Sequence, residues 1–204
     1  AGVEVSLALT KRYKKIKVLL FSGSKGILPN YSKTVQNKIN KILQSSGIEI
    51  INKGRVIKIS KNSIYSEFGE IKNVKKIILA TEGVPPDWLK KSDLNLSQCG
   101  FIQTNTKLQT TNFKNIFASG DIIKFSNKKL IKSGVYAVKS SYILAKNIRN
   151  FIIKKPLIDY KPQRFYLSII GLSNGKALAY KYKIHTISNL AHKIKGYIDT
   201  KFMK

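Results

Sequence analysis

Gly120 and Asp121 form a glycine–carboxylate pair that follows the short segment NIFA at 115–118, with only Ser119 between them. We expect this segment to be a parallel strand, and open α/β sheets bind ligands outside the carboxyl ends of their strands. An ionised carboxylate there can accept hydrogen bonds from sugar-alcohol hydroxyls, and a glycine lets the backbone pass close to a bound molecule. The pair therefore predicts a ligand site, and the alternative is that Asp121 only caps a turn.

A helix is predicted shortly after this pair, from about Ser133 to Phe151. Its start at Gly134, Val135 and Tyr136 would present free amide N–H groups and the positive end of the helix dipole to an electron-rich group. Val135 could equally belong to the core. An apolar stripe at helical spacing, which we expect to pack the helix, consists of Val135, Val138, Tyr142, Ala145, Ile148 and Ile152.

The first part of the chain alternates between helix and strand patterns, and these elements must help to position the residues above. Apolar periodicity predicts helices at 2–13 and 31–46 and strands at 16–21 and 48–51. This alternation is typical of a doubly wound α/β sheet.

The pattern then changes to short alternating segments. Strands at 55–60, 63–68 and 70–74 predict an antiparallel meander. The segment 75–81 predicts a buried, central strand, because its apolar residues at 77–80 are consecutive. A glycine and two prolines, at positions 83, 85 and 86, then break the chain where we expect it to cross between domains.

The last part of the chain predicts strands at 165–170 and 177–182 and an amphipathic helix at 187–202. The helix has one apolar face, and we expect it to pack against the domain or to connect to a following one. A membrane surface is the less favoured alternative. The residues of this face are Ile187, Leu190, Ile194, Ile198 and Phe202.

The composition excludes several classes of protein. The 204 residues are 43% hydrophobic, enough for one core or two small ones, but no apolar run approaches the ~20 residues that a membrane helix needs. The single cysteine, Cys99, excludes a disulfide framework and a Cys-pair redox centre, and it suits a reducing cytoplasm. We expect Cys99 to be an inert thiol in a turn, and His185 and His192 to be surface residues rather than metal ligands.

The net charge of +28 suggests nucleic acid at first sight, but its distribution does not. Lysines are scattered along the whole chain, and arginine occurs only at positions 12, 55, 149 and 164. Nucleic-acid binders tend to cluster their charge on one face. We therefore expect no specific nucleic-acid partner, although non-specific attraction to polyanions at low salt follows from the charge.

Two parts of the sequence resemble a known family. The opening AGVEVSLAL with KVLLFSGSKGILP resembles the end of a glycine-rich dinucleotide fingerprint, its helix and the next strand. Such a fingerprint has three glycines, and Gly2 matches the last. The preceding strand and the other two glycines would lie before Ala1, so we expect the chain to be a fragment.

The second part is longer and consists of ATEGVPP, DLNLSQCGFIQTNTKLQTTNFKNIFASGDI and KSGVYAVKSSYILAKNI, in this order. It resembles the C-terminal FAD-binding segment of the pyridine nucleotide-disulfide oxidoreductase superfamily, in particular its NADH dehydrogenase-like branch. PLIDYKPQRFYLSIIGLSNGKALAY and KGYIDTKFM resemble the oxidoreductase domain that some bacteria fuse ahead of selenide, water dikinase.

The resemblance implies an α/β fold with an incomplete Rossmann-like dinucleotide-binding domain, an antiparallel β meander and the C-terminal part of an FAD-binding domain. The truncated NAD(P)-binding domain would cover 1–90 and the FAD-binding segment 91–155. A β/helix extension at 156–204 would lead to a fused dikinase domain, of which this chain contains no motif.

The resemblance also implies cofactor contacts. Asp121 would bind the FAD ribitol, with Gly120 beside it, and the helix start at 134–136 would point at the flavin. Gly83 fits a close backbone approach to the cofactor, although Glu82 before it departs from the usual Thr-Gly pair.

Gly2 and Glu4 would open the helix that binds the nicotinamide dinucleotide. Ser22 stands where NAD-binding folds place an Asp or Glu for the ribose diol, and Arg12 and Lys25 are near it in the sequence. A serine with nearby cations could accommodate a 2′-phosphate, or could indicate weak dinucleotide binding. The choice between NADH and NADPH is left open.

The activity implied is that of an FAD-dependent NAD(P)H oxidoreductase, with the isolated fragment inactive and the small-molecule electron acceptor unidentified. Hydride transfer between cofactors needs no protein nucleophile, so we predict no catalytic acid, base or metal. The alternatives are a non-catalytic flavin-binding regulatory domain and a basic nucleic-acid-binding protein.

Overall fold

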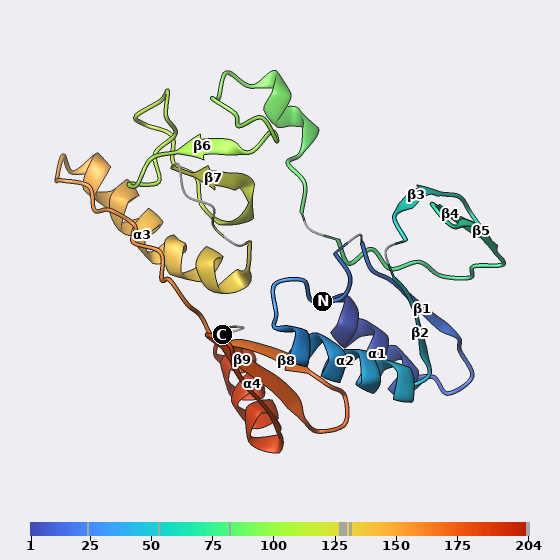
Figure 1. Cartoon of the computed structure of the whole chain (residues 1–204). Helices are drawn as coiled ribbons and strands as arrows, with labels where there is room; N and C mark the ends of the chain where they lie inside the picture. The colour runs from blue at the N-terminus through green and yellow to red at the C-terminus, as the bar shows by residue number, and fades with distance from the viewer. Residues whose placement is uncertain (24, 53, 82, 127–129, 131, 203–204) are drawn as a thin grey trace. The chain divides into compact units, whose positions relative to one another are not determined.

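The computed structural model describes residues 1–23, 25–52, 54–81, 83–126, 130 and 132–202. Two compact units are visible in Figure 1. One combines Ala1–Thr81 with Leu167–Lys204, and the other is Glu82–Tyr166. The mixed α/β fold predicted from the sequence is confirmed, with parallel strand pairs and antiparallel sheets.

The first unit begins with the predicted alternation. Helices α1 (Gly2–Arg12) and α2 (Lys33–Ser45) alternate with strands β1 (Val18–Phe21) and β2 (Ile48–Ile51), which pair in parallel. The backbone of Gly47 after α2 has a φ of 75°, the left-handed conformation that commonly ends a helix.

The predicted meander is also present. Strands β3 (Val56–Ile59), β4 (Ser63–Ser66) and β5 (Gly69–Lys72) form an antiparallel sheet in sequence order. Their partly exposed faces reflect the alternation of polar and apolar residues from which they were predicted.

The buried strand predicted at 75–81 is wrong. Its described residues form no strand, and the side chains of Ile78 and Leu79 are 57% and 71% exposed. An apolar run becomes a buried strand only with hydrogen-bonded neighbours, and among the described strands β1 and β2 pair only with each other. The segment nevertheless runs beside α1, because a Cβ built at Gly2 would lie 3.5 Å from the Cβ of Ala80.

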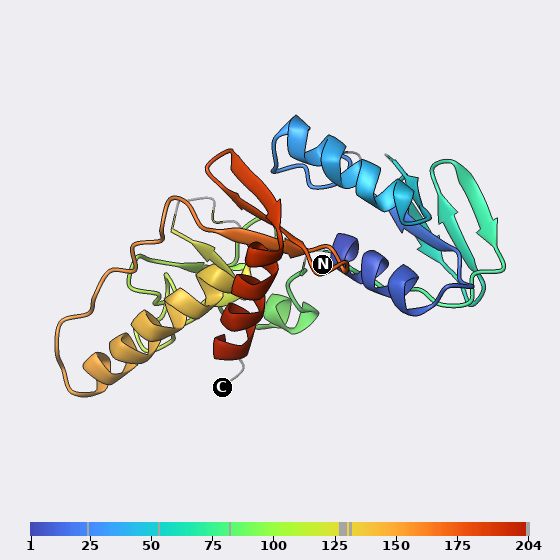
Figure 2. The same cartoon turned by 90° about the horizontal axis from the view of Figure 1, so that it is seen from below.

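The C-terminal segment completes the first unit. Strands β8 (Ser168–Gly171), β9 (Ala177–Lys181) and β10 (Ile184–Ser188) form an antiparallel sheet in the order β10-β9-β8, against which α4 (Asn189–Phe202) packs (Figures 1 and 2). Strand β10 was not predicted, and the helix was predicted to begin too early, because the apolar residues of 184–188 also fit a helical period.

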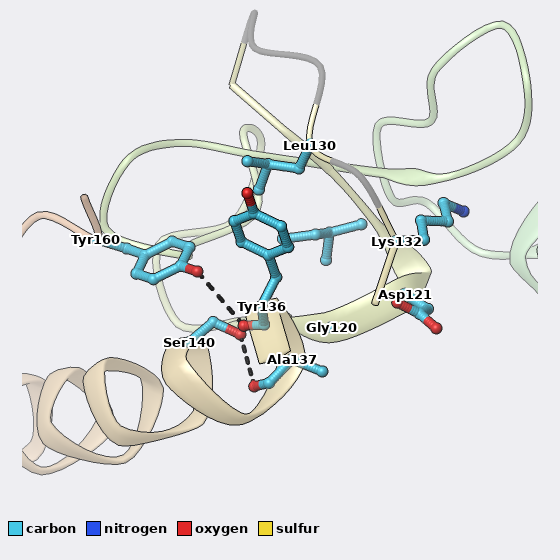
Figure 3. Close-up of a pocket in the computed structure, with 9 residues that line it drawn as sticks. Gly120, Asp121, Leu130, Lys132, Tyr136, Ala137, Ser140 and Tyr160 are labelled. Atoms are coloured by element: carbon cyan, nitrogen blue, oxygen red, sulfur yellow. Dashed lines mark hydrogen bonds between the residues drawn. The ribbon is translucent and has the colours of Figure 1, made fainter. Parts of the chain in front are cut away.

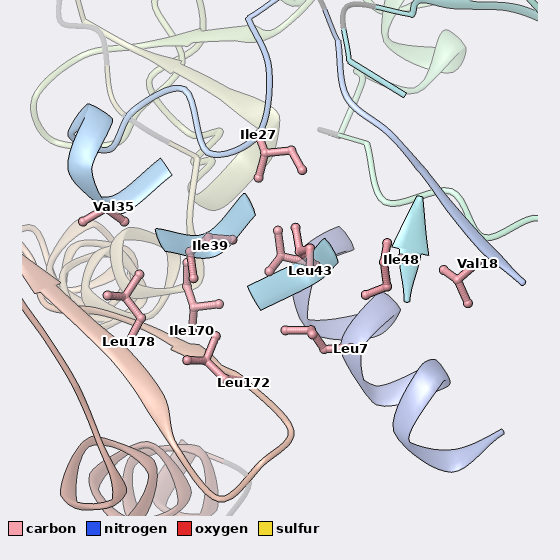
Figure 4. Close-up of a cluster of buried hydrophobic side chains, with 11 residues drawn as sticks. Leu7, Val18, Ile27, Val35, Ile39, Leu43, Ile48, Ile170, Leu172 and Leu178 are labelled. Carbon is pink, nitrogen blue, oxygen red and sulfur yellow. The ribbon is translucent and has the colours of Figure 1, made fainter. Parts of the chain in front are cut away.

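A shared core joins this sheet to the α/β elements. Figure 4 shows Ile170, Leu172 and Leu178 of the C-terminal segment facing Ile39 and Leu43 of α2. These five side chains are at most 6% exposed, so the C-terminal segment belongs to the same hydrophobic core as α1 and α2.

The second unit is built on a small parallel sheet. Strands β6 (Ile102–Thr104) and β7 (Ile123–Phe125) pair in parallel, and the 3₁₀ helices η1 (Asp87–Lys91) and η2 (Gly120–Ile122) precede them. The strand predicted at 115–118 is reduced to one isolated bridge, between Gln109 and Phe117.

Helix α3 (Gly134–Ile152) was predicted at the right place but with the wrong face buried. Its buried residues are Tyr136, Ser140 and Asn147, whereas Tyr142 and Ile152 of the predicted stripe are 71% and 72% exposed. The side chain of Asn147 explains the rotation: it donates to the carbonyls of Lys107 and Ile158 and accepts from the N–H of Ile158, each at 2.8 Å. Hydrogen bonding, rather than apolar periodicity, decides which face packs.

Within the described ranges, no helix has both the length and the apolarity that crossing a membrane requires. Cys99 is exposed and lies in a turn.

Candidate functional site

A pocket lies beside the first turns of α3 in the second unit (Figure 3). The pocket is narrow and partly open to solvent, with a free volume of about 20 Å³, close to the space that one water molecule needs. Polar and aromatic side chains from η2, from the segment before α3 and from α3 itself surround it. The lining residues are Gly120, Asp121, Ile123, Leu130, Lys132, Tyr136, Ala137, Ser140 and Tyr160.

The glycine–carboxylate pair lies at this pocket, although not in the predicted setting. Gly120 has a φ of 75°, a left-handed conformation that a residue with a Cβ adopts only with strain. Asp121 follows in η2 and therefore precedes β7, instead of following a strand at 115–118. Its side chain is exposed, and within the described part of the chain no hydrogen bond or ion pair engages its carboxylate. The carboxylate is therefore available to hydroxyl groups of a ligand.

The first turn of α3 lies next to this carboxylate. Ser133 is the N-cap residue but makes no side-chain capping bond, and its buried hydroxyl has no hydrogen-bond partner among the described residues. The amides of Tyr136 and Ala137 donate to the carbonyl of Ser133, whereas those of Gly134 and Val135 lie in the first turn, where amides have no intrahelical acceptor. Tyr136 lines the pocket; Gly134 and Val135 are adjacent to it in the chain but do not line it.

Tyrosines form one wall of the pocket. The hydroxyl of Tyr160 donates to the carbonyl of Tyr136 at 3.4 Å, and that of Tyr136 donates to the carbonyl of Gln163 at 3.0 Å. Burial raises the pKa of Tyr136, with a smaller contribution from Tyr166, whose ring centroid is 5.5 Å away. Burial and then Tyr136 raise the pKa of Tyr160. Both phenols therefore stay protonated and act as hydrogen-bond donors at neutral pH.

Lys132 brings a cation to the same pocket. Its Nζ atom is buried and lies 2.8 Å from the centroid of the Phe101 ring. In Figure 3 Lys132 and Asp121 lie on one side of the pocket, and Tyr160 and Ser140 on the other. The sequence analysis missed Lys132 and Tyr160. The position of Lys132 two residues before the helix start was a usable signal, whereas Tyr160 had none.

The residues predicted to bind the nicotinamide dinucleotide lie elsewhere, in the first unit. Gly2 packs against β1, because a Cβ built there would lie 3.5 Å from Cδ1 of Leu20. The Oε1 atom of Glu4 accepts a hydrogen bond from the backbone N–H of Gly171 at 2.9 Å and lies 3.7 Å from Nζ of Lys195. The Glu4 carboxylate is thus bound to the C-terminal segment.

Ser22 is buried at the end of β1, with its hydroxyl 3.2 Å from Oδ1 of Asn52 and 3.4 Å from the carbonyl of Ile51. Gly83 is exposed, and Glu82 lies outside the described residues. None of Gly2, Glu4, Ser22 and Gly83 lines the pocket at α3. Of the two histidines, His185 lies 3.0 Å from Nζ of Lys38, and His192 is exposed.

The pocket chemistry suits one kind of ligand. A free carboxylate can accept from several hydroxyls, while an ammonium group and the start of a helix favour an electron-rich or anionic group. The unpartnered Ser133 hydroxyl supplies a further polar contact. Such a donor set matches the hydroxyls of the sugar-alcohol chain and the carbonyl edge of a flavin.

Comparison with known proteins points in the same direction. The family model described as pyridine nucleotide-disulphide oxidoreductase matches residues 1–141. A search of the curated proteins found no match.

Solved structures match over most of this chain. NDH2 from Plasmodium falciparum, in complex with NADH, has a TM-score of 0.80 at 14% identity, covering 100% of this chain and 60% of its own. The sulfide:quinone oxidoreductase of Aquifex aeolicus has a TM-score of 0.73 at 16% identity. The match covers 98% of this chain and 53% of that protein. An FAD-dependent pyridine nucleotide-disulphide oxidoreductase from Desulfovibrio vulgaris has a TM-score of 0.69 at 16% identity. The match covers 87% of this chain and 45% of that protein. The chain thus has the fold of these proteins and spans about half of their length.

Proposed function

The chain belongs to the pyridine nucleotide-disulphide oxidoreductase family, and from this premise we propose that it is part of an FAD-dependent oxidoreductase that takes hydride from NADH or NADPH. The observation that supports this most strongly is the pocket at which Asp121, Lys132 and Tyr136 of the first turn of α3 meet. FAD and a nicotinamide cofactor are used in this family. When bound, the two cofactors supply the hydride acceptor and the hydride donor.

The residues of the second unit would hold the flavin. Asp121 would accept hydrogen bonds from the ribitol hydroxyls, and the left-handed backbone of Gly120 keeps that approach open. The free amides of Gly134 and Val135 and the ammonium group of Lys132 would favour negative charge on the carbonyl edge of the ring. The two amides and the ammonium group would stabilise the reduced, more electron-rich cofactor relative to the oxidised one.

The first unit would bind the nicotinamide dinucleotide. Gly2 would allow close approach at the start of α1, and Ser22 would lie near the ribose. Gly83, which belongs to the second unit, would allow a close backbone approach to a cofactor. Glu4 would contribute indirectly, since its carboxylate is bound to Gly171 and Lys195. A reorientation of the Ser22 hydroxyl away from Asn52 is needed before it can reach a ribose, so we expect modest nicotinamide affinity.

Two finer proposals concern partners. The likeness of the C-terminal segment supports fusion to a selenide, water dikinase domain, which would place the electron transfer near selenium metabolism in the cytoplasm. The electron acceptor would then be a small molecule. Sequencing the whole reading frame tests the fusion directly, because a following glycine-rich dikinase segment is required.

The test of the main proposal uses the protein expressed from its whole reading frame. It should purify yellow, and anaerobic addition of NADH or NADPH should bleach its flavin absorbance. A colourless, flavin-free protein would contradict the proposal. A protein that keeps FAD but reacts with neither nucleotide would instead support a non-catalytic regulatory role.

A further inference from the structure

The carboxyl ends of β1 and β2 form a polar edge in the first unit. The two strands end in register, because Phe21 pairs with Ile51, and Ser22 and Asn52 follow them. The hydroxyl of Ser22 lies 3.2 Å from Oδ1 of Asn52, and its N–H donates to the carbonyl of Ile51 at 3.1 Å. Dinucleotide-binding folds contact the adenosine ribose from this end of the second strand. The residues at this edge therefore decide which ribose fits.

Acidic side chains do not reach this edge. A site for NAD places an Asp or Glu there to accept a hydrogen bond from the ribose 2′-hydroxyl, but the sequence from 5 to 48 contains neither. The acids of the first unit are Glu4, Glu49, Glu67, Glu70 and Asp199. All of these carboxylates except that of Glu67 lie within 3.7 Å of a lysine Nζ atom, and Glu67 lies in the turn between β4 and β5. The ribose hydroxyl thus lacks its usual acceptor.

A lysine stands next to the edge. Lys25 follows Ser22 by three residues, in a turn that is closed by a 2.8 Å hydrogen bond from the N–H of Gly26 to the carbonyl of Gly23. Its side chain is exposed and makes no ion pair with any described residue. A Cβ built at Gly23 would meet nothing within 4 Å, so the space beside the turn is open. Lys25 can therefore bring its ammonium group to an anion bound at the strand end.

Arg12, the other cation that is near Ser22 in the sequence, lies at the opposite end of the strand. It is the last residue of α1, and the chain then leads into the start of β1. At this amino end Nζ of Lys17 lies 2.7 Å from the carboxylate of Glu49. Of the two cations, Lys25 is the one that the fold places at the ribose edge.

We propose that the first unit selects NADPH over NADH, with Lys25 binding the 2′-phosphate and with Ser22 and Asn52 as its neutral neighbours. The inference rests on the proposed function and deepens it by naming the hydride donor. A phosphate group carries between one and two negative charges at neutral pH, so it gains from an ammonium group and would be repelled by a carboxylate. NADH has only the hydroxyl at this position and gains nothing comparable from Lys25.

Two adenosine bisphosphates test the site without any redox reaction. Titration calorimetry of the protein expressed from its whole reading frame compares adenosine 2′,5′-bisphosphate with adenosine 3′,5′-bisphosphate, which has the same charge. At about 0.15 M salt the 2′,5′ isomer should bind at least about tenfold more tightly. Lys25→Ala should remove most of this difference, whereas Lys41→Ala, an exposed lysine of α2, should change it by less than about twofold.

Stopped-flow reduction of the bound flavin tests the choice of hydride donor. Under anaerobic conditions the second-order rate constant with NADPH should exceed that with NADH at least about tenfold. Ser22→Glu supplies the missing acceptor and should invert this preference. Because Ser22 is buried, Lys25→Glu provides a second variant in an exposed turn, and it should lower the rate constant for NADPH at least about tenfold while that for NADH changes less than about twofold.

Three outcomes would overturn the proposal. Equal affinities for the two bisphosphates would leave only attraction by the net charge of +28. Faster flavin reduction by NADH would assign the opposite preference, and a Lys25→Ala variant that keeps the 2′ preference would remove Lys25 from the site. A flavin that neither nucleotide reduces would contradict the proposed function instead, and a preserved preference for the 2′,5′ isomer would then still support the phosphate site.

Discussion

The backbone N–H of Gly171 donates a hydrogen bond of 2.9 Å to Oε1 of Glu4, across 167 positions of the sequence. Nζ of Lys195 lies 3.7 Å from the same oxygen. The first turn of α1 is thereby bound to both β8 and α4. A residue in the first turn of α1 thus holds the C-terminal segment in place.

Replacing Glu4 by alanine should destabilise the protein more than it weakens nicotinamide binding. The amide of Gly171 loses its acceptor, so we expect a loss of about 1 kcal/mol in the free energy of unfolding, because the carboxylate is only partly buried. Urea unfolding measures this loss. Glu67→Ala is the control, since the Glu67 side chain is exposed, and it should change stability by less than about 0.5 kcal/mol. A large rise in the Kd for NADH with unchanged stability would contradict this role.

The stabilisation by Lys195 should disappear at high pH. The hydrogen bond that Lys195 donates to Asp199, at 2.7 Å, and the charge of Glu4 raise the pKa of Lys195 above its ordinary value of 10.5, against an opposing effect of burial. A raised folded-state pKa means that the contribution is complete below about pH 10.5 and is lost as the pH rises through the folded value.

Lys195→Met isolates this contribution. The difference in unfolding free energy between the unmodified protein and the variant should be constant from pH 7 to pH 9 and should shrink as the pH rises beyond 10.5. Lys193→Met, on an exposed position of the same helix, should show no such trend. A difference that grows with pH would have the wrong sign for this ion pair.

The sequence was most informative where one local pattern determined the structure. The helices at 2–12 and 33–45, the parallel pair β1–β2 and the antiparallel meander follow from apolar periodicity and turn residues. Periodicity could not reveal which face of α3 packs, because Asn147 bonds to backbone groups 40 and 11 positions away. The strand predicted at 75–81 was wrong for a related reason. A strand forms only beside a hydrogen-bonded neighbouring strand, and the residues of 75–81 do not determine whether such a strand is present.

The residues of the candidate site were likewise predicted only where a local sequence pattern marks them. Gly120, Asp121 and Tyr136 were predicted from adjacent segments and lie at one pocket. Tyr160 reaches the pocket through tertiary packing against Phe125, with ring centroids 5.4 Å apart, and no local pattern marks it. Glu4 was predicted as a cofactor contact because the sequence did not show that Gly171 folds back onto it.

Removing the carboxylate of Asp121 should weaken FAD binding. A hydrogen bond to a charged group contributes about 1.5–3 kcal/mol, so Asp121→Ala should raise the Kd for FAD about 10- to 100-fold. The matched control is Asp93→Ala, an exposed carboxylate of the same unit that does not line the pocket. Fluorescence titration of the apoprotein with FAD measures both. Equal effects of the two substitutions would exclude a direct contact by Asp121.

Asn147 should be the most sensitive polar residue of α3. Its side chain is fully buried, and Asn147→Ala leaves the N–H of Ile158 and the carbonyls of Lys107 and Ile158 without their partner. Each buried unsatisfied group costs about 1–3 kcal/mol, so we expect a loss of about 3 kcal/mol in unfolding free energy. Asn150→Ala, one turn later, removes a single exposed bond to the carbonyl of Pro156 and should cost less than about 1 kcal/mol. Denaturant unfolding should therefore give clearly different free energies of unfolding for the two variants. Equal losses would mean that the apolar residues of α3, and not the hydrogen bonds of Asn147, decide which face of the helix packs.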